Sequence, residues 1–174
     1  MKVLYGPDFY IKENTAVAIG KFDGLHIGHR KVIEELIHNS KLKNLKSVVY
    51  TFEKNPKLVL NQENFIPIMT NEEKTKEFER IGVDYLVYEK FDEDFAKVEP
   101  ENFVKDVLVD KLSAKLIVMG NNSTFGNDRR GNTTMMEELG SKYGFEVVNV
   151  NMILNNGKVV SSTDIRKHNF SIKY

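Results

Sequence analysis

Two histidines, His26 and His29, stand three positions apart in the segment GKFDGLHIGH, residues 20–29, which we call the histidine turn. An apolar run at 15–19 precedes it, so the pattern indicates a strand, a turn and the start of a helix. Residues three apart lie on one face of a helix, so both imidazoles can donate to one ligand. A helix N-terminus also favours negative charge. The histidine turn therefore predicts a phosphate site suited to attack on the α-phosphate of a nucleoside triphosphate.

A metal site is the alternative interpretation of a histidine pair. Zinc needs a third and usually a fourth ligand, and the chain has no cysteine. The other histidines, His38 and His168, stand in contexts that indicate no such site. Carboxylates remain available as ligands, so this alternative stays open, and we assign no residue to a metal.

The overall composition is typical of a soluble globular protein. Of the 174 residues, 41% are hydrophobic and 29% charged, and the formal net charge is zero, which argues against an electrostatic nucleic-acid binder. Neither a signal-like apolar segment nor a run of membrane-spanning length is apparent. We expect one domain over residues 1–174 and a cytoplasmic location.

Strand-like and helix-like segments alternate along the chain. The strand-like runs are 16–20, 47–52, 84–88, 116–119 and 146–150, and the helical patterns between them are 29–39, 71–81, 100–112 and 133–143. Gly82 and Gly144 stand where helix C-caps are expected. This alternation predicts an α/β fold with a parallel sheet covered on both faces, whose ligands bind beyond the carboxyl ends of the strands.

Two further segments carry candidate binding residues. Near the C-terminus, Ser161, Ser162 and Thr163 precede Arg166, a pattern that fits an ordinary helix cap or a second anion site. Because the chain also carries the histidine turn, we favour a second anion site over a helix cap, since two anion sites can hold one triphosphate from both ends. The loop at 120–132 is polar and glycine-rich, and it fits either a solvated connection or a site in which Phe125 stacks on a planar ligand beside Asn122.

Taken together, these segments resemble the FMN adenylyltransferase (FAD synthetase) module of prokaryotic bifunctional riboflavin kinase/FAD synthetases, in the His-x-Gly-His nucleotidyltransferase superfamily. The matching stretches, which run nearly end to end, are 20–29, 51–56, 91–104, 120–131 and 161–166. The resemblance implies a Rossmann-like α/β/α fold that binds ATP between the first and last motifs. It also implies FMN beside the Asn122 loop and Mg²⁺ bridging the phosphates, with FAD and pyrophosphate as products.

The resemblance also implies roles for single residues. His26 and His29 donate to the α- and β-phosphate oxygens, and Asp23 orients a histidine or a magnesium-bound water. The residues implied to hold the β- and γ-phosphates are Ser161, Ser162, Thr163 and Arg166. Those implied to shape the turn for close approach of the nucleotide are Gly20, Phe22 and Gly28. No general base is required, because the attacking phosphate of FMN is already ionised.

The chain departs from the family pattern at Asn55 and Ser123, and it ends eight residues after Arg166, so we expect no riboflavin kinase module. Two other functions stay open. The first is adenylyl or cytidylyl transfer to another phosphorylated acceptor, such as a pantetheine or nicotinamide nucleotide. The second is a catalytically weak protein that binds nucleotide or flavin. The chain is too short for a class I aminoacyl-tRNA synthetase, which also uses such a histidine motif.

Overall fold

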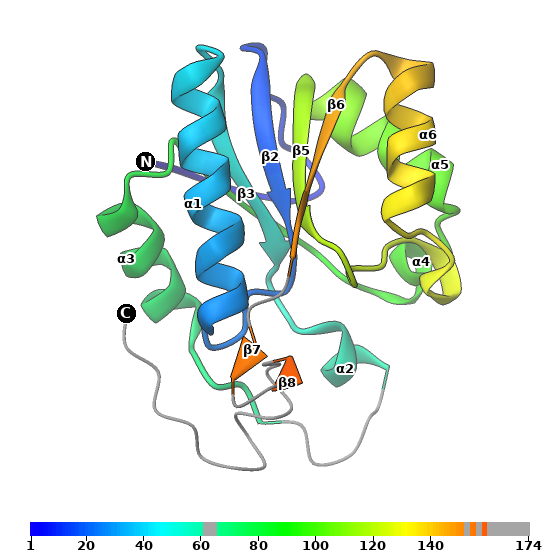
Figure 1. Cartoon of the computed structure of the whole chain (residues 1–174). Coiled ribbons are helices and arrows are strands. Elements are labelled where there is room, and N and C mark those ends of the chain that lie inside the picture. Colours follow the sequence, from blue (N-terminus) through cyan, green and yellow to red (C-terminus); the bar gives the residue numbers. More distant parts are fainter. Residues whose placement is uncertain (61–65, 152–153, 156–157, 160–174) are drawn as a thin grey trace.

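A six-stranded sheet, parallel throughout, forms the centre of the molecule (Figure 1). The computed structural model describes residues 1–60, 66–151, 154–155 and 158–159. The strands are β1 (Lys2–Tyr5), β2 (Thr15–Ile19), β3 (Lys46–Phe52), β4 (Tyr85–Glu89), β5 (Ala114–Gly120) and β6 (Glu146–Val150), in the order β1-β4-β3-β2-β5-β6. A short antiparallel ribbon of β7 (Leu154–Asn155) and β8 (Lys158–Val159) lies at the lower end of the molecule in Figure 1.

Helices cover both faces of the sheet (Figure 1). The helical segments are α1 (Ile27–Leu42), α2 (Pro56–Val59), α3 (Asn71–Ile81), α4 (Glu93–Ala96), α5 (Pro100–Asn102), the π-helix η1 (Phe103–Lys111), the 3₁₀ turn η2 (Asn127–Arg129) and α6 (Thr133–Tyr143). Helices α1 and α3 pack on one face, and η1 and α6 pack on the other. No helix within the described ranges is long and apolar enough to cross a membrane.

The core consists of two apolar layers separated by the sheet. Alternate residues of β2 point to opposite faces, so Ala16 and Ala18 join the layer under α1 and α3, whereas Val17 and Ile19 join the layer under η1 and α6. All five residues of β2 are buried, as expected for a central strand of a doubly covered parallel sheet. The predicted α/β/α fold is confirmed.

The order of the strands reverses between β2 and β5. The connections β2-α1-β3 and β3-α3-β4 run along one face, and the later connection through α6 runs along the other. In open α/β sheets ligands bind outside the carboxyl ends of the strands at such a switch point. The histidine turn follows β2 and the glycine-rich loop follows β5, so the topology brings both predicted segments to this place.

Local sequence signals set most of the helix ends. Thr70 and Glu73 form a capping box at the start of α3, and Gly82 and Gly144 end α3 and α6 with φ of 98° and 85°. The bounds predicted for α3 and α6 are confirmed.

The structure has short elements that the sequence patterns do not predict, namely β1, α2, α4, η2, β7 and β8, and one predicted helix changes its type. Strand β1 was not predicted, because a four-residue edge strand has too short a pattern to be distinguished and gains its partner only from β4. The helix predicted at 100–112 leaves α-geometry at Phe103 and continues as η1, in which the amide of Leu112 donates to the carbonyl of Val107.

Candidate active site

The histidine turn has an unusual backbone that the core holds in place. Phe22, Gly24 and Leu25 all have positive φ, at 48°, 84° and 42°. Bulky residues rarely adopt this conformation, which costs on the order of 1–3 kcal/mol each. The side chains of Phe22 and Leu25 are 1% and 2% exposed, so their burial offsets the cost. The turn is therefore fixed by packing rather than by glycines alone.

The His26 imidazole caps the N-terminus of α1. Its Nδ1 accepts hydrogen bonds from the backbone amides of Gly28, at 3.1 Å, and His29, at 3.4 Å. An accepting Nδ1 carries no proton, so the neutral ring has its N–H on Nε2. The imidazole occupies two of the amides at the helix start that are expected to bind phosphate, and phosphate binding there stays a prediction. The donor that His26 can offer a ligand is Nε2–H.

His29 stacks on His26 with ring centroids 3.7 Å apart, which confirms that the two imidazoles share one face of the turn. The edge of Phe22 meets His29 at a centroid distance of 5.4 Å. Burial, reinforced by the positive charge of Lys74, holds the pKa of His29 well below its usual range, so the ring is neutral at pH 7. Its Nδ1 is buried and has no hydrogen-bond partner among the described residues.

The predicted glycines serve close packing in the turn. A Cβ on Gly20 would lie 3.1 Å from the Phe22 ring, so a larger residue there requires the ring to shift by a few tenths of an ångström. Gly28 is buried in the first turn of α1, beside the imidazole cap. The predicted role of both glycines in close approach of the nucleotide stays a prediction.

The carboxylate of Asp23 ties the turn to the segment before α3. Its Oδ1 accepts from the amides of Ile68, at 2.9 Å, and Met69, at 3.3 Å, and the residue is 3% exposed. The predicted contact with a histidine or a magnesium-bound water stays a prediction, and the anchoring of this segment is an additional role. No group of three or more His, Cys, Asp or Glu that could hold a metal occurs among the described residues.

Lys74 is a residue that the sequence analysis missed. It lies on α3 and is 7% exposed, and its Nζ donates to the carbonyl of Lys21 in the histidine turn at 3.3 Å. Burial lowers its pKa to about 8. A signal was available, because Lys74 stands four residues before the buried Phe78 and so shares the inward face of α3.

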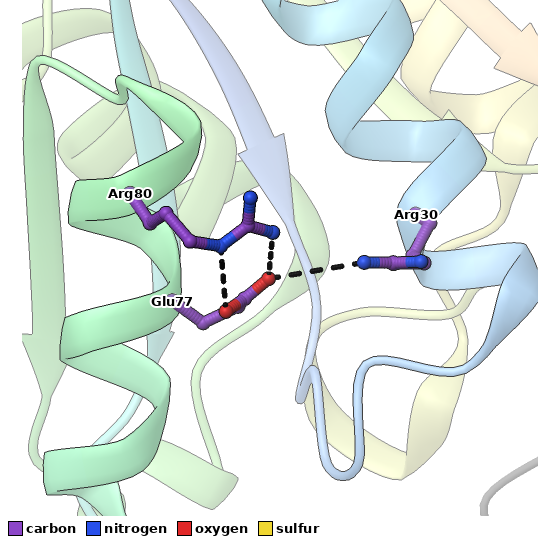
Figure 2. A network of polar contacts seen from close by, with 3 residues as sticks. All are labelled: Arg30, Glu77 and Arg80. Carbon is purple, nitrogen blue, oxygen red and sulfur yellow. Dashed lines mark hydrogen bonds and ion pairs between the residues drawn. The ribbon is translucent and has the colours of Figure 1, made fainter. Parts of the chain in front are cut away.

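An ion-pair network joins the first turn of α1 to α3 (Figure 2). Glu77 on α3 accepts two hydrogen bonds from Arg80 and lies 3.8 Å from the guanidinium of Arg30 on α1. The Glu77 side chain is 13% exposed, and the hydrogen bond from Arg80 is the main cause that lowers its pKa. The network fixes α3 against the helix that begins with the histidine pair.

The loop after β5 differs from its prediction in one residue. Asn122 is exposed, as a ligand-facing amide requires. The expectation that Phe125 presents an open ring to a ligand is wrong, since it is 8% exposed and belongs to the core. It pairs with Gly131, where a Cβ would lie 2.5 Å from its ring, and it meets Phe103 at a centroid distance of 6.0 Å.

A continuous cluster of aromatic rings joins this loop to the ends of β3 and β4. Its members, each within 6.1 Å of a neighbour between ring centroids, are Tyr50, Phe52, Phe91, Phe95, Phe103 and Phe125. Phe52, Phe91 and Phe95 are partly exposed. The three middle segments that carry the family resemblance therefore meet in one aromatic surface.

The remaining predicted residues, Ser161, Ser162, Thr163 and Arg166, lie outside the described residues. The described part of the site is thus the histidine pair, its supports on α3, and the aromatic surface.

Comparison with known proteins agrees with this geometry. Residues 9–164 match the model of the family described as FAD synthetase. A bifunctional riboflavin kinase/FMN adenylyltransferase from Buchnera aphidicola subsp. Schizaphis graminum is 36% identical over 159 residues, covering 90% of this chain and 51% of the relative. The protein of that description from Escherichia coli K12 is 31% identical over 157 residues, covering 90% and 50%.

Among solved structures, a macrolide-efflux protein from Streptococcus pneumoniae superposes with a TM-score of 0.83 and 26% identity, over 96% of this chain and 55% of that one. The chain spans about half the length of the curated relatives it matches. The matched region contains the histidine turn, the α3 supports and the aromatic surface. The chain therefore belongs to the FAD synthetase family.

Proposed function

We propose that this protein is an FMN adenylyltransferase, which transfers AMP from ATP to FMN and releases pyrophosphate. The observation that carries the proposal is the stacked, neutral histidine pair at the start of α1, at the switch point of a FAD synthetase family sheet. The names of the relatives, riboflavin kinase/FMN adenylyltransferase, support the choice of flavin as acceptor.

In the proposed reaction a phosphate oxygen of FMN attacks the α-phosphate of magnesium-bound ATP. The P–O bond to the β-phosphate breaks, and pyrophosphate leaves with the electron pair. Because the nucleophile is already ionised, the protein supplies alignment and stabilisation of developing charge rather than a base. Each neutral imidazole has one N–H to donate, and for His26 it is Nε2–H, since Nδ1 is held by the cap. The positive end of α1 acts in the same direction.

The flavin side of the proposal rests on the aromatic surface. Phe52, Phe91 and Phe95 are partly exposed and offer an apolar contact for a planar ring system, and Asn122, which follows β5, has an exposed side chain. Phe125 supports this surface from within, through Phe103. For the far end of the nucleotide we propose Ser161, Ser162, Thr163 and Arg166 as ligands of the β- and γ-phosphates.

The test is incubation of the 174-residue chain with MgATP and FMN, with chromatographic detection of FAD and pyrophosphate. Equimolar formation of both products supports the proposal. Parallel reactions offer phosphopantetheine or nicotinamide mononucleotide, and adenylylation of either without FAD would indicate transfer to another acceptor. Binding of FMN and ATP with no product would indicate a protein that binds without turnover.

A further inference from the structure

We propose that Lys74 binds the phosphate chain of the nucleotide, as a third polar group of the histidine turn beside His26 and His29. The inference rests on the proposed function and assigns a role to a residue that lies far from the turn in the sequence.

The ammonium of Lys74 lies against the histidine turn. Nζ lies 3.3 Å from the carbonyl oxygen of Lys21, the second residue of the histidine turn. The charge of Lys74 is also one of the causes that lower the pKa of His29. Lys74 therefore approaches the turn from α3, the helix that the Arg30–Glu77–Arg80 network fixes against α1 (Figure 2).

The structural need for a cation at this position is small. The carbonyl of Lys21 already accepts a hydrogen bond from Thr51 Oγ1 at 3.1 Å, so the ammonium is not its only donor. Lys74 forms no ion pair within the described part of the chain, and one hydrogen bond leaves two of its three N–H groups for other acceptors. Burying a cation without an anion is costly, so an anionic ligand is the partner that best explains its burial.

The protonation of Lys74 gives the inference a specific signature. Burial lowers its pKa to about 8, and its charge is in turn one of the causes that lower the pKa of His29 on α1. The other ionisable groups of the histidine turn are Lys21, Asp23 and His26. A bound triphosphate favours the ammonium form and raises the pKa again. Above pH 8, binding of the nucleotide must therefore be accompanied by uptake of a proton.

The first experiment compares Lys74→Met with Lys76→Met by calorimetric titration with MgATP and with magnesium pyrophosphate at pH 7.5. Lys76 is the matched control, because it lies on the same helix with a side chain 74% exposed. We expect Lys74→Met to weaken both affinities by about tenfold to a hundredfold, as for loss of a charged hydrogen bond. Lys76→Met should match the wild type. A folded Lys74→Met variant with unchanged affinities would overturn the inference.

The second experiment measures proton uptake by the wild type at pH 9, by titration with MgATP in buffers of different ionisation enthalpy. We expect about one proton per nucleotide, since ATP and both histidines are fully deprotonated there. This measurement decides the question even if Lys74→Met does not fold, and absence of uptake would overturn the inference. If the wild type forms FAD but takes up no proton on binding MgATP, only the role of Lys74 is contradicted, and the proposed function stands. A wild type that binds no MgATP would contradict the proposed function as well.

Discussion

At the scale of single residues, the histidine pair both caps α1 and offers hydrogen-bond donors to a phosphate, and the sequence does not show which histidine does which. His26 satisfies two amides at the start of α1, and this bond fixes its remaining N–H on Nε2. His29 lies against both His26 and Phe22, and burial keeps it neutral. A neutral donor binds a phosphate oxygen less strongly in the ground state than a cation does. We therefore expect His29 to stabilise mainly the transition state, in which negative charge develops on the phosphate oxygens.

For His29→Asn we expect kcat to fall by about a hundredfold to a thousandfold, as for loss of one donor to developing charge. The affinity for MgATP should change far less. The measurement is steady-state formation of FAD, with calorimetric titration of MgATP. His38→Asn is the control, since His38 is exposed on the same helix. Near-normal turnover of His29→Asn would contradict its role.

For Arg166→Ala we expect a different kinetic pattern. A cation on the pyrophosphate portion acts in both the ground and the transition state, so its loss should raise the KM for ATP and also lower kcat. Initial rates over a range of ATP concentrations measure both constants. If a folded Arg166→Ala variant keeps the KM of the wild type, the segment at 161–166 is only a helix cap.

At the scale of elements, α3 supports the site that α1 begins. It places Lys74 under the histidine turn, and its Glu77 pairs with Arg30 in the first turn of α1 (Figure 2). The segment before α3 is held by Asp23 of the turn itself. The histidine turn and α1 therefore contact both the segment that leads into α3 and the residues within α3.

We expect Glu77→Gln to lower the free energy of unfolding by about 1 kcal/mol, because Glu77 is mostly buried and serves two arginines. The matched control is Glu72→Gln on the same helix. Its side chain is 78% exposed, and its single pair with Lys76 should contribute at most about 0.5 kcal/mol. Urea unfolding measures the change in the free energy of unfolding for both variants. Equal changes would show that the Arg30–Glu77–Arg80 network contributes no more to stability than an exposed ion pair.

The loop after β5 allows a second test at this scale. Because a Cβ on Gly131 would lie 2.5 Å from the Phe125 ring, Gly131→Ala should destabilise the protein by about 1–3 kcal/mol. In a Phe125→Leu background the added methyl group finds room, so the same substitution should cost less there. A double-mutant cycle of thermal unfolding measures this coupling. Additive effects of the two substitutions would contradict the close contact between Gly131 and the Phe125 ring.

At the scale of the whole molecule, two apolar layers pack on opposite faces of one six-stranded sheet. The strands β2 and β5, which end at the site, are also the centre of the core. Their residues Ala16, Ala18, Leu116 and Val118 are buried on one face of the sheet, and Val17, Ile19, Ile117 and Met119 are buried on the other. Changes in protonation at the site therefore affect the stability of the entire fold.

We expect the free energy of unfolding to decrease as the pH is lowered, because His29 is protonated more readily in the unfolded chain than in the folded protein. Its pKa is lowered in the folded state, so below the unfolded value of about 6.5 only the unfolded chain takes up this proton. Stability is then full above about pH 6.5 and is lost as the pH falls, by at most about 1.4 kcal/mol per pH unit. Urea unfolding from pH 7.5 to 5 should show a shallower dependence for His29→Asn. Parallel curves for the two proteins would contradict a buried, neutral His29.

Sequence patterns alone located the elements and motifs that short-range chemistry controls. Apolar periodicity and capping residues gave the bounds of α3 and α6, and the spacing of His26 and His29 gave their common face, because each depends on residues within a few positions. The helix at 100–112 shows the limit of this reasoning, since nothing local indicated its change to a π-helix at Phe103.

Only the tertiary structure decided which side chains meet. Lys74 reaches Lys21 across 53 positions, Asp23 anchors Ile68 across 45, and the aromatic surface gathers rings from three separate segments. Phe125 looked like a ligand contact in a polar loop, yet its contact with Phe103 and Gly131 places it in the core. Long-range packing selects such contacts from many that the sequence allows, and so it determined what surrounds the histidine pair, whereas local patterns determined only that the pair exists.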